Sequence, residues 1–189
     1  VLPAEDQQRI SEEVLEVYAP LANRLGLEKI RVPLEDLALQ ILNPQIYRQI
    51  IQFLEESREQ REALIAEFIR LVKEYAADKI DIIKIKGRSK SIYSIYKKMI
   101  QRNVPLTEQY DLSGVRVLVP EIKDCYALLG LLHEKFEPVE GRLKDYIANP
   151  KPNFYRSIHT GLMLPNKKIV EVQIRTPEMD EFAEEGLAA

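Results

Sequence analysis

The sequence predicts an α+β fold in which a mixed β-sheet is flanked by helices and preceded by an all-helical segment. Up to residue 78, apolar residues recur at the three- and four-residue spacing of amphipathic helices. From Lys79 onward, runs with the two-residue alternation of strands interleave with helical runs, which indicates a sheet covered by helices. We therefore expect two segments, 1–78 and 79–189.

The first segment is expected to contain several helices. Apolar residues within 10–25 lie on one helical face, and Pro20 is expected to kink or end that helix. A short helix is expected over 34–42, another from about Pro44, and a longer one over 64–75. This segment has 9 Lys and Arg against 15 Asp and Glu, a net charge of −6.

The second segment contains the expected strands. They cover 80–86, 114–119, 157–164 and 167–176, with helices over 89–102, 123–135 and from 178 onward. The last two strands flank Pro165-Asn166-Lys167, a turn sequence that predicts a hairpin. This segment has 18 Lys and Arg against 15 Asp and Glu, a net charge of +3, so we expect anion-binding chemistry here.

The composition of the 189 residues, 46% hydrophobic and 30% charged, suits one ordinary domain with a helical extension. The single cysteine, Cys125, excludes an internal disulfide and favours a reducing cytosol; we interpret it as a buried small apolar residue rather than a nucleophile. No apolar run approaches the roughly 18 residues of a membrane span, and no signal-peptide pattern is present. Without an initiator methionine, the chain is expected to be a fragment of a longer protein.

Alternation along the strands predicts one polar face of the sheet. Val170, Val172 and Ile174 are expected to face the core, and Ile83 and Ile85 likewise in the first strand. The residues expected on the opposite face are Lys84, Lys86, Arg88, Ser157, His159, Glu171, Gln173 and Arg175. A ligand site for an anion fits this set, and an exposed sheet face of mixed charge explains it without any ligand.

The helix after the first strand is basic. Residues 79–102 hold eight cations and one acid, and Gly87-Arg88-Ser89 joins the strand to the helix. A helix N-terminus with free amides beside Arg88 and Lys90 suits a phosphate group. A solvated basic face of the helix is the alternative explanation.

Asp111 and Glu171 are the candidate metal ligands. Asp111 precedes an apolar strand, where an aspartate usually serves a turn. Paired with Glu171 on a neighbouring strand, it would instead offer Mg²⁺ hard oxygen ligands. The sequence has no zinc-ligand spacing, phosphate-binding glycine loop or nucleophile elbow, so a metal-assisted transfer between nucleotides fits the available groups better than a protein nucleophile.

Five ordered motifs resemble the synthetase domain of the RelA/SpoT family, whose members make the alarmone (p)ppGpp. They are Gly87-Arg-Ser-Lys-Ser-Ile-Tyr-Ser-Ile-Tyr-Lys-Lys-Met99, Tyr110-Asp-Leu-Ser-Gly-Val-Arg116, Arg142-Leu-Lys-Asp-Tyr-Ile-Ala148, Asn153-Phe-Tyr-Arg-Ser-Ile-His-Thr160 and Glu171-Val-Gln-Ile-Arg-Thr176. Residues 11–42 resemble the helices that join the hydrolase domain to the synthetase in long Rel proteins, and the metal-binding His-Asp motif of the hydrolase has no counterpart. The resemblance implies a nucleotidyltransferase-like synthetase domain over 79–189, preceded over 1–78 by the end of a hydrolase domain and linker helices.

The resemblance also implies an activity: transfer of the β,γ-pyrophosphoryl group of ATP to the ribose 3′-hydroxyl of GDP or GTP. Arg88 and Arg116 would enclose the adenine, and Lys90, Ser94 and Lys98 would hold the phosphates of ATP.

The same resemblance assigns the metal and the acceptor nucleotide. Asp111 and Glu171 would hold Mg²⁺, and Glu171 is also a candidate base towards the 3′-hydroxyl. Tyr155 would stack on guanine. The other acceptor residues would be Lys144, Lys151, Asn153, His159 and Gln173.

The sequence departs from the family pattern at several positions. Phe154 stands where the family usually has glycine, and Arg156 where it has glutamine. Ser89 and Ser91 replace the more usual proline and histidine. Arg142-x-Lys144-Asp145 matches the basic variant of bifunctional members, which implies a preference for GDP.

Two other functions stay open. One is a catalytically silenced, nucleotide-binding regulatory module; the other is an RNA-binding domain that uses the basic residues 79–102. For the enzyme we expect ATP and GDP or GTP as substrates, Mg²⁺ as cofactor and a cytoplasmic location. Contact with the ribosome is expected only through regions absent from this fragment, and neither membrane nor direct nucleic-acid binding is expected.

Overall fold

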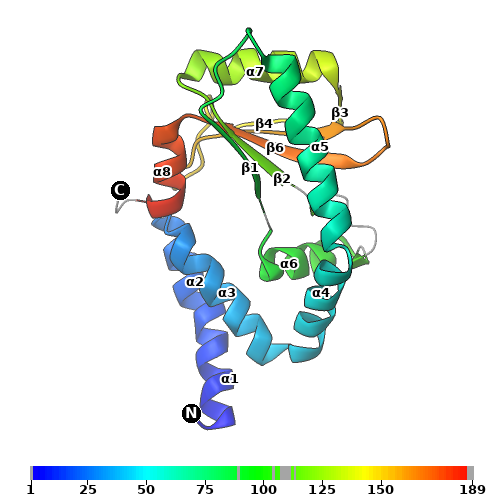
Figure 1. Cartoon of the computed structure of the whole chain (residues 1–189). Helices are drawn as coiled ribbons and strands as arrows, with labels where there is room; N and C mark the ends of the chain where they lie inside the picture. The colour runs from blue at the N-terminus through cyan, green and yellow to red at the C-terminus, as the bar shows by residue number, and fades with distance from the viewer. Residues whose placement is uncertain (1, 89, 104, 107–111, 113, 187–189) are drawn as a thin grey trace. The chain divides into compact units, whose positions relative to one another are not determined.

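The computed structural model describes residues 2–88, 90–103, 105–106, 112 and 114–186, which form helices and one mixed sheet (Figure 1). Packing divides the chain into two compact units. The helical unit consists of Val1–Arg58, Lys90–Gln109 and Phe182–Ala189, and the sheet unit of Glu59–Ser89 and Tyr110–Glu181. The boundary expected at residue 78 from the change of hydrophobic period stays a prediction.

In the helical unit, Pro20 does not end the first helix. Helix α1 (Ala4–Glu13) passes through a π-helical turn, η1 (Val14–Tyr18), into α2 (Ala19–Arg24). Tyr18 before α2 keeps helical dihedral angles, so Pro20 lies inside a continuous helix, directly after the π-helical turn, and removes one backbone donor. The π-helical turn was not expected from the sequence, and Val17 and Leu21, expected on one apolar face, are exposed.

Helix α3 (Glu28–Leu42) begins six residues earlier than expected and contains Pro33. It packs against α1 and α2, and this packing outweighs the one backbone hydrogen bond that the proline removes. Helix α4 (Pro44–Glu56) follows, with the Asn43 side chain accepting a hydrogen bond from the Ile46 amide at 3.5 Å. Helix α6 (Ile92–Arg102) packs on α3 and α4 and ends at Asn103, which has a φ of 49°.

The sheet unit has six described strands in the order β1-β2-β6-β5-β3, with β4 also paired to β5. They are β1 (Lys84–Arg88), β2 (Gly114–Leu118), β3 (Glu137–Pro138), β4 (Lys144–Asp145), β5 (Ile158–Met163) and β6 (Ile169–Arg175). Strands β2 and β6 are parallel and the other pairs are antiparallel, which confirms the mixed sheet and the hairpin between β5 and β6. The two-residue strands β3 and β4 were not expected, because two residues are too few to show alternation.

One face of the sheet forms the core. Helix α5 (Arg58–Ala76) and helix α7 (Ile122–Lys135) contribute Phe68 and Leu128 to the same buried cluster, and the Phe68 and Phe136 rings lie 5.3 Å apart. As expected, Val170, Val172 and Ile174 are fully buried and Cys125 belongs to this cluster. Burial raises the pKa of the Cys125 thiol to about 11, so the thiol is a poor nucleophile. Helix α8 (Pro177–Glu185) follows β6 and starts within the sheet unit.

The expectation that Ile83 faces the core was wrong. It is 53% exposed, because β1 begins only at Lys84, while Ile85 packs against the core as expected.

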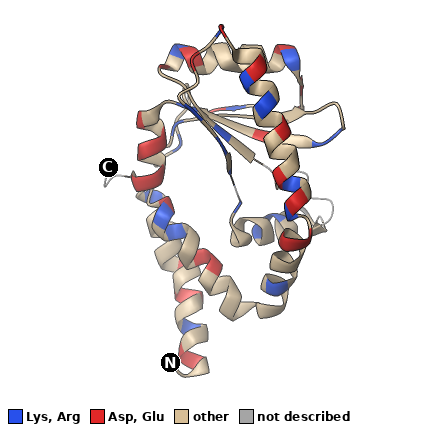
Figure 2. Ribbon diagram, viewed as in Figure 1, with Lys and Arg blue, Asp and Glu red and all other residues tan. Residues whose placement is uncertain are grey.

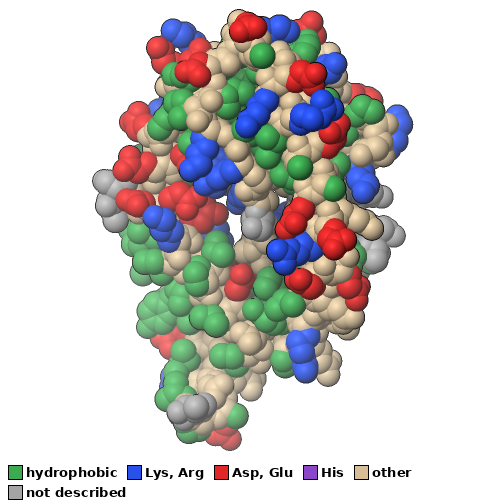
Figure 3. All heavy atoms as spheres, in the orientation of Figure 1, with side chains coloured by type: hydrophobic (Ala, Val, Ile, Leu, Met, Phe, Trp, Pro, Cys, Tyr) green, Lys and Arg blue, Asp and Glu red, His purple; other side chains and the backbone are tan. Residues whose placement is uncertain are grey.

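The helical unit exposes many apolar side chains, visible as green areas in Figure 3. Val17 and Leu21 are exposed on η1 and α2, and Ile30, Leu37 and Ile41 on α3. Among the residues that the structure describes, no helix is long and apolar enough to cross a membrane.

Candidate functional site

The polar face of the sheet contains a row of five residues, one from each of five strands. Pairing places Lys86 opposite Arg116, Arg116 opposite Gln173, Gln173 opposite His159, and His159 opposite Lys144. Paired residues on neighbouring strands share a face, so the predicted polar face is confirmed. Figure 2 shows Lys and Arg in blue along β1, the strand at one edge of the sheet.

Glu171 lies in the next row, between two glycines. Gly114 on β2 and Gly161 on β5 are its partners in register. A Cβ atom at Gly161 would lie 3.0 Å from the Arg142 Cβ, so any other residue there would push Arg142 a few tenths of an ångström away from the sheet. The Glu171 side chain keeps 30% of its surface exposed, which leaves the carboxylate accessible.

Arg175 connects the polar residues near the end of β6. Its side chain is 1% exposed, and its guanidinium donates to Ser157 Oγ at 3.3 Å, to Gln173 Oε1 at 3.2 Å and to the Tyr155 hydroxyl. The same guanidinium pairs with Asp180 Oδ1 on α8 at 3.1 Å. A buried guanidinium needs this number of partners, since desolvation of an unpaired charge is costly.

A second part of the network joins Tyr155 to Glu171. The Tyr155 hydroxyl lies 2.7 Å from His159 Nε2, and His159 Nδ1 lies 3.5 Å from Glu171 Oε1. Burial lowers the pKa of His159, although the Glu171 carboxylate acts in the opposite direction. At neutral pH, His159 is therefore a neutral imidazole between the tyrosine and the carboxylate.

Three rings form an aromatic cluster beside this network. Tyr146 meets Tyr155 and His159 edge to face, with ring centroids 5.9 and 5.3 Å apart, and Tyr155 and His159 are 5.8 Å apart. Lys151 Nζ lies 4.8 Å from the Tyr146 centroid and 4.5 Å from that of Tyr155.

A tight turn presents Tyr155. The Phe154 amide donates to the Lys151 carbonyl at 2.8 Å, and the Lys151 amide donates to the Tyr155 carbonyl at 3.1 Å. This is a three-residue hairpin turn, whose last loop position adopts the left-handed conformation and favours glycine. Phe154 occupies that position with a φ of 61° and is 63% exposed. The glycine expected there from the family pattern thus has a backbone reason.

The predicted ATP-binding residues are divided between the two units. Arg88 and Arg116 belong to the sheet unit, where Arg116 is 5% exposed and pairs with Asp180 Oδ1 at 2.8 Å. Lys90, Ser94 and Lys98 belong to the helical unit.

The first-turn amides of α6 are not free, contrary to expectation. Asp36 Oδ1 on α3 accepts from the Tyr93 amide at 2.7 Å, and Ser91 Oγ accepts from the Ser94 amide at 3.3 Å. The Ser94 hydroxyl itself lies 2.6 Å from Ser91 Oγ. A phosphate group would have to replace these acceptors in order to bind the same amides.

The predicted metal ligands are described only in part, because Asp111 lies outside the described residues. Within the described part of the chain, no group of three or more His, Cys, Asp or Glu residues is placed to hold a metal ion. Of the two predicted metal ligands, Glu171 is the one described, and its side chain is 30% exposed. This fits Mg²⁺ in its common mode, in which one or two carboxylates and substrate phosphates hold the ion.

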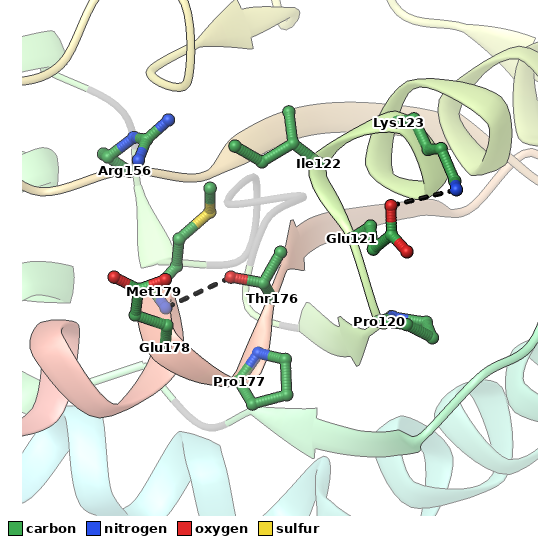
Figure 4. Close-up of a pocket in the computed structure, with 9 residues that line it drawn as sticks. All are labelled: Pro120, Glu121, Ile122, Lys123, Arg156, Thr176, Pro177, Glu178 and Met179. Carbon is green, nitrogen blue, oxygen red and sulfur yellow. Dashed lines mark hydrogen bonds and ion pairs between the residues drawn. The ribbon is translucent and has the colours of Figure 1, made fainter.

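A cavity of about 550 Å³ lies in the sheet unit beyond the ends of β2 and β6 (Figure 4). It is lined by Pro120, Glu121, Ile122, Lys123, Arg156, Thr176, Pro177, Glu178 and Met179. None of the predicted site residues lines it. Its Lys123 and Glu121 side chains pair with each other at 2.9 Å, so much of its charge is satisfied internally.

The chain is similar to known proteins over its whole length. The family described as "Region found in RelA / SpoT proteins" matches residues 87–189. The chain belongs to the RelA/SpoT family. All of it aligns, with 45% identity, to 22% of a GTP pyrophosphokinase of Streptomyces antibioticus, and with 43% identity to 26% of the bifunctional (p)ppGpp synthase/hydrolase RelA of Mycobacterium tuberculosis. It therefore spans about a quarter of these relatives.

Solved structures of small alarmone synthetases share the fold. Small alarmone synthetase 1 of Bacillus subtilis, in complex with its product pppGpp, has a TM-score of 0.52 and 30% identity over 72% of this chain and 78% of that one. Small alarmone synthetase 2 of the same organism has a TM-score of 0.52 and 33% identity over 70% of this chain and 74% of that one. The fold is thus the α+β fold of alarmone synthetases, as the motifs implied.

Compared with the family-based prediction, the structure brings Lys151, Tyr155, His159, Glu171 and Gln173 into one connected cluster. Lys144 adjoins it on β4, and Asn153 lies in the turn before Tyr155, with Oδ1 accepting from the Tyr155 amide at 3.4 Å. The roles of these residues stay predictions.

Three further residues are connected to this cluster and had no predicted role: Tyr146, Arg175 and Asp180. Tyr146 and Arg175 lie inside two of the motifs that resemble the family, so their position was a usable signal. Nothing in the sequence around Asp180 distinguishes it from an ordinary carboxylate in the first turn of a helix.

Proposed function

We propose that this chain is the synthetase part of a GTP pyrophosphokinase. It would transfer the β,γ-pyrophosphoryl group of ATP to the 3′-hydroxyl of GDP or GTP and release AMP. The observation that carries the proposal is the connected cluster of Tyr155, His159 and Glu171 on the polar face of a sheet whose fold is that of alarmone synthetases.

The acceptor nucleotide is assigned to the aromatic end of this cluster. Tyr155 is the stacking residue for guanine, because its ring is rigidly held through its hydroxyl and lies among exposed or half-buried groups. Lys144 and Lys151 are exposed and supply positive charge for the phosphates of GDP or GTP. The small synthetase bound to pppGpp supports a guanine nucleotide as the ligand of this fold.

Glu171 is assigned as the base. Its carboxylate would take the proton of the 3′-hydroxyl while the 3′-oxygen forms a bond to the β-phosphorus and the bond from that phosphorus to the α,β-bridging oxygen breaks. Neutral His159 at 3.5 Å orients one carboxylate oxygen without neutralising it. Transfers of this type depend mainly on positioning and on compensation of charge.

Mg²⁺ belongs to the proposal, since its charge would neutralise the transferred phosphates. Glu171, together with Asp111, would hold it. A cytoplasmic location and a preference for GDP, implied by Arg142-x-Lys144-Asp145, are further parts of the proposal.

The test is a Mg²⁺-dependent assay with γ-labelled ATP and either GDP or GTP. Labelled tetraphosphate or pentaphosphate, formed together with AMP and absent with Glu171→Gln, would support the proposal and rank the acceptors. Binding of both nucleotides without product would instead favour the silenced regulatory module. The 5% exposure of Arg116 bears on the predicted adenine contact, because a guanidinium this buried offers little surface to a base.

A further inference from the structure

Asp180 on α8 bridges two buried arginines with a single oxygen atom. Its Oδ1 lies 2.8 Å from Arg116 Nη1 and 3.1 Å from Arg175 Nη1. The exposed fractions of the three side chains are 15% for Asp180, 5% for Arg116 and 1% for Arg175. One carboxylate thus compensates two guanidinium groups on the neighbouring parallel strands β2 and β6.

The two arginines belong to different parts of the proposed site, one on the ATP side and one on the guanine side. Arg116 is the residue predicted to contact the adenine of ATP. Arg175 donates to the Tyr155 hydroxyl, and Tyr155 is the residue predicted to stack on the guanine of the acceptor. From Tyr155 the contacts continue through His159 to Glu171.

Because both arginines share one oxygen, they cannot move independently at low cost. A shift of Arg116 towards a base would weaken or displace its contact with Asp180. The carboxylate would then be held by Arg175 alone, which changes the bond that Arg175 offers to Tyr155. The low dielectric of a buried site makes such charged contacts strong and their loss expensive.

We propose that Asp180 is a positioning residue that couples the ATP side of the site to the guanine side through Arg116, Arg175 and Tyr155. The inference rests on the proposed function, which supplies the two nucleotides. It predicts that binding of one nucleotide changes the affinity for the other, and that this coupling depends on the Asp180 carboxylate.

The test measures the Kd of GDP for the full chain in Mg²⁺, with and without a saturating ATP analogue that has a methylene group between the α and β phosphates. Such an analogue binds but cannot transfer its pyrophosphoryl group. The parent chain is expected to show an affinity ratio of about 10, within the usual range for coupled sites. In Asp180→Asn, which keeps the shape and loses the charge, the ratio is expected to fall below about 2. By reciprocity, the Kd of the analogue must change by the same factor when GDP is added.

Glu181→Gln is the matched control, because it removes the same charge from the next, exposed residue of α8. Its ratio is expected to equal that of the parent. A merely structural Asp180 would lower the melting temperature and both affinities but leave their ratio unchanged, and that result would overturn the inference.

If Asp180→Asn does not fold, Tyr155→Phe decides the question. This variant keeps the ring and removes the hydroxyl that receives the Arg175 bond, so the ratio is again expected to fall below about 2. An unchanged ratio in Tyr155→Phe would overturn the inference. Formation of labelled product by the parent chain tests the proposed function separately, so a parent that makes product but shows no coupling would sink the inference alone.

Discussion

The ammonium group of Lys151 lies 4.5 Å from the centroid of the Tyr155 ring, within the range of a cation–π contact. The guanidinium carbon of Arg175 lies 4.8 Å from the same centroid. Arg175 is buried and held by several partners, whereas Lys151 is exposed. A base that stacks on Tyr155 would therefore take the place of Lys151 rather than that of Arg175. Stacking contributes about 1–3 kcal/mol per base, which exceeds the roughly 0.5–1 kcal/mol of an exposed cation–π contact.

The first prediction concerns Tyr155. Replacement by alanine removes the stacking ring, so we expect Tyr155→Ala to weaken GDP binding about 10- to 100-fold and binding of the ATP analogue less than about 3-fold. Isothermal titration calorimetry with each nucleotide measures both effects. Tyr18→Ala, at an exposed tyrosine of the helical unit, is the control. Equal losses for the two nucleotides would count against guanine stacking.

The second prediction concerns Glu171. Glu171→Gln keeps the size of the side chain and removes its basicity, so we expect synthesis to fall at least about 100-fold, while the Kd of GDP changes less than about 3-fold. Single-turnover product formation and equilibrium binding provide the two measurements. Near-normal synthesis in this variant would remove Glu171 from the catalytic role.

The third prediction concerns the left-handed conformation of Phe154. A residue with a Cβ loses roughly 1–2 kcal/mol in this conformation, and glycine loses roughly 0.5–1 kcal/mol more chain entropy than alanine on folding. We therefore expect Phe154→Gly to raise the free energy of unfolding by about 0.5–1 kcal/mol in urea titrations. Phe154→Ala is the matched control: it removes the same exposed ring, keeps the strain, and is expected to change stability by less than about 0.5 kcal/mol. Equal effects of the two variants would show that the backbone is not the cause.

The fourth prediction concerns pH. Burial lowers the pKa of His159 below its ordinary value of 6.5, so the unfolded chain takes up a proton at this residue before the folded chain does. The free energy of unfolding is therefore expected to fall as the pH drops through about 6.5. His159→Gln should reduce this slope, by at most about 1.4 kcal/mol per pH unit.

His133, the other of the two histidines in the chain, is expected to contribute to the same slope. Burial lowers its pKa too, so His133→Gln should reduce the slope in the same sense. Burial raises the pKa of Glu35 and Asp36, which gives a slope of the opposite sign from about pH 4 upward. Glu35 and Asp36 are present in the parent chain and in every histidine variant, so their contribution cancels when the slope of the parent is subtracted from that of a variant. A parent-like slope in the double histidine variant would contradict the prediction.

The fifth prediction concerns the start of α6. Asp36 Oδ1 accepts from the Tyr93 amide at 2.7 Å, as a capping residue does, although it comes from another helix. Asp36→Ala leaves this amide without its acceptor, so we expect a loss of about 1–2 kcal/mol in the free energy of unfolding. Glu16→Ala, at an exposed carboxylate, should change it by less than about 0.5 kcal/mol. If the α6 amides also bind phosphate, Asp36→Ala should at the same time tighten binding of the ATP analogue.

Local patterns account for what the sequence predicted well. The alternation from Val170 to Arg175 and the turn at Pro165-Asn166-Lys167 each involve a few neighbouring residues, and both the buried face and the hairpin are confirmed. The start of α3 was missed, because packing among the helices outweighs the local preference of proline.

The sequence by itself therefore determined the class of the fold, the polar face of the sheet and, through its motifs, the family. Only the tertiary structure decided which polar residues meet. The pairing of parallel strands β2 and β6 brings Arg116 beside Arg175, and the start of α8 then places Asp180 on both. Arg116 and Asp180 are 64 positions apart, and no local period relates them. Their contact follows from strand pairing and from the need of buried guanidinium groups for a counter-charge, both of which are satisfied only after the sheet has formed.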